Sequence, residues 1–184
     1  MKKAYKDINI VLIQSCKKGN RKAQFEVYKL YSKAMFNASF RILNNKTEAE
    51  DTIQEAFLKA FQKINSFSED VSFGAWLKKI VVNASLDKLR KNKIEFYNID
   101  DVNLSNIEQE VNENKTNEYE VKQIKDAIQL LPDGYRIILS LYLLEGYDHD
   151  EISKIMGITA STSRSQLARA KKKLIQELKK AEQN

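Results

Sequence analysis

Helix-breaking residues are almost absent from this chain, and their scarcity limits the folds open to it more than any other feature. Only one proline and five glycines occur in 184 residues. Apolar residues recur at intervals of three and four, which is the spacing of one helix face. Alternating runs joined by tight hairpin turns, which would indicate strands, are nearly absent. We therefore predict an all-α protein.

Charge is distributed unevenly along the chain. Residues 93–120 hold eight acidic and two basic residues, a net charge of −6, whereas the whole chain carries +6. The rest of the chain therefore carries +12. Basic ends around an acidic middle favour a polyanionic partner for the ends, although many basic proteins never touch nucleic acid.

Helical spacing divides the chain into three parts. It is regular over residues 1–92 and 119–184, and poor over the Asn-, Asp- and Glu-rich residues 93–118. This pattern predicts two small helical domains joined by an acidic flexible linker. The linker also contains apolar residues such as Phe96 and Tyr97, whose role the sequence leaves open.

Four successive helices are predicted in the first domain. The apolar stripe of the second helix is predicted to consist of Ala23, Val27, Leu30, Ala34, Ala38 and Ile42. Thr47 and Glu50 are the two ends of a predicted capping box at the start of the third helix. The fourth helix is predicted from Phe73 to about Lys91, with Trp76 on its buried side.

The second domain is predicted to contain four helices. Pro132 suits the first turn of a helix that is apolar nearly all round and should therefore be central. A short helix capped by Asp148, a turn at Gly157 and a long basic helix then follow, in the pattern of a helix-turn-helix. The long helix begins with side chains that can read base edges and continues with lysines and arginine suited to phosphates. A surface helix with a solvated basic face is the alternative.

Four blocks of sequence, read together, identify a family. Residues 48–64, 73–91, 131–158 and 161–174 resemble, in order and spacing, the extracytoplasmic-function class of bacterial RNA polymerase sigma factors, in the sigma-70 family. The resemblance covers nearly the whole chain outside the linker. It implies a region 2 type domain at 1–92, which docks on core RNA polymerase and melts the downstream promoter element. It also implies a region 4 type domain at 119–184, which reads the upstream element.

The resemblance assigns roles to particular residues of the first domain. Docking on core polymerase would use the third helix, through Asp51, Gln54, Glu55 and Leu58; a solvated surface is the alternative. Capture of single-stranded promoter DNA would use the fourth helix and the loop before it, through Phe67, Lys79, Ile80, Asn83, Asp87, Lys88, Arg90 and Lys91. Core packing is the alternative for Phe67 and Ile80. For Asp87 the alternative is an ion pair with a neighbouring lysine or arginine side chain.

The resemblance also implies a set of residues that contact duplex promoter DNA. These are Ser161, Thr162, Ser163, Arg164, Gln166, Arg169, Lys172 and Lys173. Ser161 stands where many members of the family have glycine, so the base preference of this chain is expected to differ. Promoter DNA and core polymerase are the expected partners. An anti-sigma factor is known for many relatives, and no residue here identifies one.

Other classes of function find little support in the sequence. Cys16 is the single cysteine and His149 the single histidine, so neither a disulfide nor a metal cluster is indicated. No catalytic set or phosphate-binding glycine loop occurs, so we expect a protein that is not an enzyme and has no cofactor. No apolar stretch approaches the length of a membrane span. We expect a cytoplasmic protein, monomeric when free; a dimeric helix-turn-helix repressor is the alternative.

Overall fold

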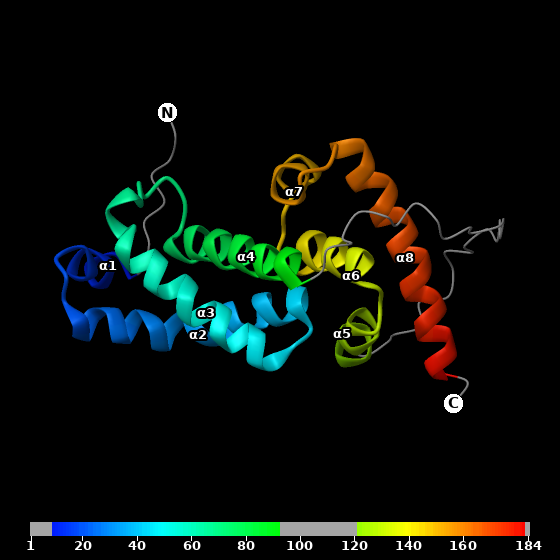
Figure 1. The fold of residues 1–184 in the computed structure, drawn as a ribbon, viewed down its shortest axis with the longest axis horizontal. Helices are drawn as coiled ribbons and strands as arrows, with labels where there is room; N and C mark the ends of the chain where they lie inside the picture. Colours follow the sequence, from blue (N-terminus) through cyan, green and yellow to red (C-terminus); the bar gives the residue numbers. More distant parts are fainter. Residues whose placement is uncertain (1–8, 93–120, 183–184) are drawn as a thin grey trace. The chain divides into compact units, whose positions relative to one another are not determined.

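A computed structural model describes residues 9–92 and 121–182 of the chain (Figure 1). Within these two ranges every regular element is a helix, which confirms the prediction of an all-α fold. The chain divides after Asn92 into two compact units, which are described separately below. The predicted linker at 93–118 lies outside the described residues. In the described ranges, no helix combines the length and apolar character that a membrane crossing requires.

The first unit is a bundle of α-helices with one short 3-10 turn. Its elements are α1 (Ile10–Lys17), α2 (Arg21–Leu43), α3 (Lys46–Gln62), η1 (Ile64–Ser66) and α4 (Phe73–Asn92). The three long helices α2, α3 and α4 pack against one another, and α1 packs against the start of the bundle through α2 (Figure 1). Phe73 and Leu77 are fully buried at the start of α4. The burial of Cys16 on α1 raises the pKa of its thiol.

The buried face of α2 differs from the predicted one. Val27, Ala38 and Ile42 are buried as predicted, but Leu30 is 56% exposed and Ala34 also lies at the surface. Met35 is buried in the middle of the helix instead. Both sets of residues have helical spacing, so the periodicity alone does not decide which flank of the helix faces its neighbours.

Two adjacent asparagines end α2 and begin α3. Asn44 has φ 52°, in the left-handed region that asparagine tolerates well. Asn45 caps α3, because its side chain accepts a hydrogen bond of 3.1 Å from the backbone N–H of Glu48. The predicted capping box of Thr47 and Glu50 is therefore wrong. Thr47 lies inside the first turn, since Asn45 caps the helix two residues earlier.

The second unit is built around a short buried helix. Its elements are α5 (Val121–Gln129), α6 (Asp133–Leu139), the π-helical turn η3 (Ser140–Leu144), α7 (His149–Met156) and α8 (Ala160–Glu182). Residues 134–141 are all buried, which confirms that this helix is central. Pro132 occupies the N-cap position of α6 and lies one residue before the predicted first turn. Buried Arg136 is paired, at 2.6 Å, with Asp133.

Candidate docking groove and nucleic-acid interfaces

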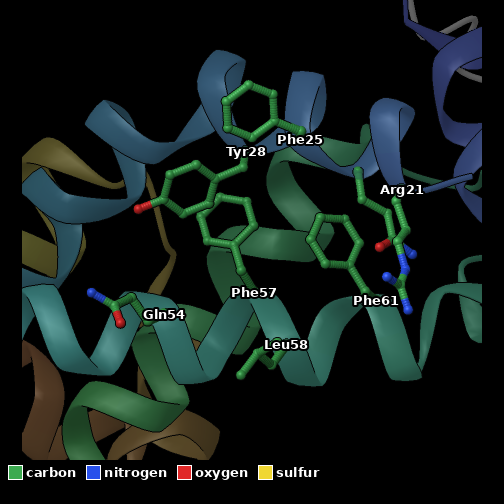
Figure 2. A pocket seen from close by; sticks show the side chains of 8 residues that line it. Arg21, Phe25, Tyr28, Gln54, Phe57, Leu58 and Phe61 are labelled. Atoms are coloured by element: carbon green, nitrogen blue, oxygen red, sulfur yellow. The ribbon is translucent and has the colours of Figure 1, made fainter.

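An open groove lies between α2 and α3 of the first unit. Its lining residues are Arg21, Gln24, Phe25 and Tyr28 from α2, and Gln54, Phe57, Leu58 and Phe61 from α3. Figure 2 shows the ring of Tyr28 lying next to that of Phe57, and their centroids are 4.8 Å apart in an edge-to-face arrangement. Such pairs of aromatic rings are favourable beyond the area they bury. The rings hold the two helices together and give the groove an apolar floor.

The predicted docking residues of α3 lie on and beside this groove. Gln54 and Leu58 line it, and Leu58 is 64% exposed. Asp51 and Glu55 are exposed on the neighbouring outer face of α3, one helical turn apart. The structure therefore brings the four residues together on one exposed part of α3, with Gln54 and Leu58 in the apolar groove and the carboxylates of Asp51 and Glu55 as an acidic rim beside it.

Sequence reasoning missed the contribution of α2 to this site. Phe25 is 57% exposed at the edge of the groove, and the ammonium group of Lys29 lies 4.5 Å from the centroid of its ring. Phe25 and Tyr28 are three residues apart and lie outside the apolar stripe predicted for α2. Two aromatics at helical spacing on a side of the helix away from the predicted buried face were the available signal.

Apart from Lys88, the predicted single-strand contacts of α4 share one side of that helix. Lys79, Asn83, Asp87, Arg90 and Lys91 are exposed, whereas Ile80 and Lys88 are half-buried. An oxygen of Asp87 lies 3.1 Å from a guanidinium nitrogen of Arg90, as expected from the alternative that Asp87 forms an ion pair with a neighbouring basic residue. The exposed face thus offers amide and cationic groups along residues 79–91 of α4.

Phe67, by contrast, belongs to the core. Its side chain is 2% exposed, and its ring packs against Phe73 and Trp76, with centroids 5.4 and 5.6 Å away. The prediction that this ring stacks on a DNA base is not compatible with its burial in this structure. Trp76, predicted to be core, is only half-buried and lies on the same side of α4 as Asn83. The aromatic ring that reaches this face is therefore that of Trp76.

The helix-turn-helix of the second unit has the predicted construction. Asp148 and Glu151 form a reciprocal capping box at the start of α7. Gly157 ends α7 with φ 73°, a conformation that glycine adopts without strain. The side-chain oxygen of Thr159 accepts a hydrogen bond of 3.0 Å from the backbone N–H of Thr162 and so caps α8. Buried Ile152 and Leu167 contribute to the packing of the two helices.

The predicted duplex-contacting residues divide between two sides of α8. Ser161, Arg164, Arg169 and Lys172 are exposed, and Thr162, Gln166 and Lys173 are half-buried at the flank. Ser163 is fully buried and its Oγ lies 2.9 Å from Nδ1 of His149. The prediction that Ser163 reads a base edge is not compatible with this position, because the side chain faces α7.

The exposed side of α8 also contains residues that the sequence reasoning left out. Ser165 and Ala168 are exposed, and helical spacing places them between Arg164 and Lys172. A hydroxyl and a methyl group are both able to contact base edges.

Lys173, one of the predicted phosphate contacts, is already in an ion pair. It lies 3.5 Å from Glu177, which also accepts a hydrogen bond from Lys180. That hydrogen bond is the largest cause of the lowered pKa of Glu177.

The described residues form no cluster of metal-binding side chains. Across residues 9–92 and 121–182, no three His, Cys, Asp or Glu side chains come together in a way that could hold a metal ion. The surfaces in these ranges that expose groups suited to binding a partner are the α2–α3 groove, the exposed side of α4 and the exposed side of α8.

Two family models match the chain, one in each unit. The model described as "Sigma-70 region 2" matches residues 27–94, and that described as "Sigma-70, region 4" matches residues 122–174. The first match includes the exposed side of α4 and the part of the groove from Tyr28 onward, whereas Arg21, Gln24 and Phe25 precede it. The second includes the helix-turn-helix.

Similar proteins extend the match over most of the chain. ECF RNA polymerase sigma factor SigW of Bacillus subtilis is 30% identical over 177 residues, which cover 91% of this chain and 95% of SigW. SigM of the same organism is 31% identical over 150 residues, which cover 81% of this chain and 91% of SigM. The solved structure of the sigma factor RpoE from Bartonella quintana shares the fold. It has a TM-score of 0.57 and 23% identity, and the match covers 84% of this chain and 95% of RpoE.

Proposed function

This chain belongs to the extracytoplasmic-function family of RNA polymerase sigma factors, and we propose that its α2–α3 groove and the exposed sides of α4 and α8 have separate roles in transcription initiation. As a sigma factor it is not an enzyme; it binds core RNA polymerase and promoter DNA and directs the initiation of transcription. Residues 1–92 dock on the polymerase and hold the melted downstream element. Residues 119–184 read the upstream element, and 93–118 link the two.

The α2–α3 groove is the polymerase-docking site in this proposal. The observation that carries it is the exposure of Leu58 and Phe25, at 64% and 57%, beside an aromatic floor. Exposed apolar side chains grouped in a groove are typical of a surface that binds a partner. The carboxylates of Asp51 and Glu55 border the groove and favour a partner helix with basic residues.

The exposed side of α4 is the proposed binding surface for the melted strand. Asn83 offers an amide for a base edge, and Lys79 and Lys91 offer cations for the phosphate backbone. Trp76 supplies an aromatic face at the start of the helix, where a base can stack. Because Arg90 is already close to Asp87, its phosphate contact would compete with that ion pair.

The exposed side of α8 is the proposed reader of the duplex upstream element. Ser161, Arg164 and Ser165 lie in the first two turns, where the side chains of a recognition helix reach base edges. Arg169 and Lys172 follow toward the C-terminal half and suit phosphates. Gln166 and Thr162 contribute from the flank of the helix.

Location and regulation follow from this role. The protein is proposed to act in the cytoplasm, where the polymerase transcribes DNA. The RpoE structure of similar fold is a complex with the anti-sigma factor NepR. An anti-sigma partner of this chain would be expected to cover the docking groove, since a partner on that surface excludes the polymerase.

A matched pair of leucines tests the docking site. Leu58 and Leu30 are exposed to similar extents, 64% and 56%, but only Leu58 lines the groove. Leu58→Ser should weaken binding to purified core polymerase by at least about 1 kcal/mol, the threshold for an interface residue that matters. Leu30→Ser should bind like the original protein. Equal effects of the two substitutions would contradict the proposal that the groove is the docking site.

A further inference from the structure

The connection between α3 and α4 is held from one side by α1. Helix α1 contacts the turn η1 at the start of this connection (Figure 1). Lys17, the last residue of α1, donates a hydrogen bond of 3.0 Å from Nζ to the backbone oxygen of Phe67. The same nitrogen lies 3.7 Å from Oε1 of Glu69 and 5.5 Å from the ring centroid of Phe67. One ammonium group thus joins the backbone, a carboxylate and an aromatic ring of the loop.

A second residue of α1 supports the same anchor. Gln14, one turn before Lys17, donates a hydrogen bond of 2.7 Å to Oε1 of Glu69. Glu69 has φ 62°, a left-handed conformation that is unfavourable for a residue with a side chain and persists only when its surroundings hold it. The Lys17 side chain is only 20% exposed, so its contacts are better shielded from water than those of a free surface ion pair.

Next to the anchor, several polar side chains of the loop are exposed. Phe67 is buried and its carbonyl is bonded to Lys17, so the loop backbone is fixed at its centre. Asn65, Ser68 and Asp70 are exposed around that point. Ser68 Oγ donates a hydrogen bond of 2.8 Å to Asp70, which orders this part of the loop. An ordered loop with exposed polar groups therefore comes directly before α4 in the chain.

We propose that α1 positions this loop for promoter opening, with Lys17 as the positioning residue. The proposal rests on the proposed role of α4 in holding the melted strand, and it adds the loop that precedes α4 to that surface. A flexible loop loses conformational entropy when it closes on a ligand, which weakens binding. Lys17 and Gln14 fix the loop before DNA arrives, so less entropy is lost when a base is captured. Lys17 itself need not touch DNA.

The test compares Lys17 with its neighbour in the full-length protein bound to core polymerase. Lys17→Met keeps the aliphatic stem and removes the ammonium group. Lys18→Met makes the same change of charge at an exposed residue outside the anchor. The rate of open-complex formation on a linear promoter should fall about tenfold for Lys17→Met, the loss expected for one charge-assisted hydrogen bond. Lys18→Met should leave it unchanged, and both variants should bind polymerase normally.

Two further measurements separate positioning from general stability. Lys17→Arg retains a cation able to donate to both the carbonyl and the carboxylate, so it should restore most of the opening rate. Hydrogen exchange of Lys17→Met should become faster in residues 65–72 and remain unchanged in α2 and α3. Glu69→Gln, at a partly exposed side chain, should slow opening less than Lys17→Met. The two changes combined should lose less than the product of their separate effects.

An α4 variant distinguishes failure of the inference from failure of the proposed function. If Asn83→Ala slows opening and Lys17→Met does not, the positioning role is wrong while the role of α4 stands. If neither variant changes opening, the proposed role of α4 is wrong and the inference falls with it. If Lys17→Met weakens polymerase binding as much as opening, or Lys17→Arg restores nothing, Lys17 only maintains the fold. A loss of opening restored by arginine supports the inference.

Discussion

Nδ1 of His149 lies 2.9 Å from Oγ of Ser163, so a hydrogen bond joins the first residue of α7 to the first turn of α8. The imidazole ring stacks on Tyr142, with the centroids 4.9 Å apart and the planes 26° from parallel. Ser163 is fully buried, which shields the bond from water. The pair therefore helps to fix the two helices of the helix-turn-helix relative to each other.

Substitutions of Ser161 and Ser163 should have opposite effects, one on base preference and the other on stability. Ser163→Ala should destabilise the second unit by about 1 kcal/mol, because it removes a buried hydrogen bond. Ser161→Ala changes an exposed residue and should cost within about 0.5 kcal/mol. Hydrogen exchange of α7 and α8 measures both effects. Base preference in the upstream element should change for Ser161→Ala and stay the same for Ser163→Ala; the reverse pattern would contradict the assignment.

The acidic rim of α3 should serve docking without contributing to the fold. Replacing Asp51, Gln54 and Glu55 together with alanine should lower stability by no more than about 0.5 kcal/mol for each exposed residue. Binding to core polymerase should weaken clearly, and its dependence on salt should become shallower, because two charges are lost. Trp76, the single tryptophan, reports unfolding of this unit by fluorescence. A loss of stability without a loss of binding would contradict the assignment.

Phe67 and Trp76 should separate core packing from strand binding. Phe67→Ala should destabilise the first unit by about 3–5 kcal/mol, the usual cost of removing a buried aromatic side chain. Trp76→Ala should cost less because the ring is half-buried, but it should slow promoter opening by polymerase bound to this protein. Trp76→Phe retains an aromatic face and is the control. Normal opening by Trp76→Ala would exclude its stacking role.

Arg164 and Lys172 should affect DNA binding in different ways. Arg164→Ala should cost roughly 1–3 kcal/mol and relax preference at one base position, if its side chain reaches a base edge. Lys172→Ala should weaken binding to all sequences alike and make the salt dependence shallower by about one unit of slope. The measurement is binding of upstream-element variants at several salt concentrations. Uniform losses from both substitutions would mean that α8 only attracts phosphates.

The sequence by itself determined the features that depend on neighbouring residues. The scarcity of helix breakers predicted the helical fold, and the capping box at Asp148 and the glycine turn at Gly157 predicted the helix-turn-helix. These features are local, because a cap or a left-handed turn involves only a few adjacent residues.

Only the tertiary structure decided which side of each helix is buried. Leu30 and Met35 both fit a helical stripe, yet Leu30 is exposed and Met35 is buried. Phe67 and Ser163 fit binding roles by sequence but are buried, and Phe25 lies at the edge of a groove formed by two helices. The anchor from Lys17 to Phe67 joins residues 50 positions apart. Such relationships depend on how the helices pack, and contacts between distant parts of the chain determine that packing.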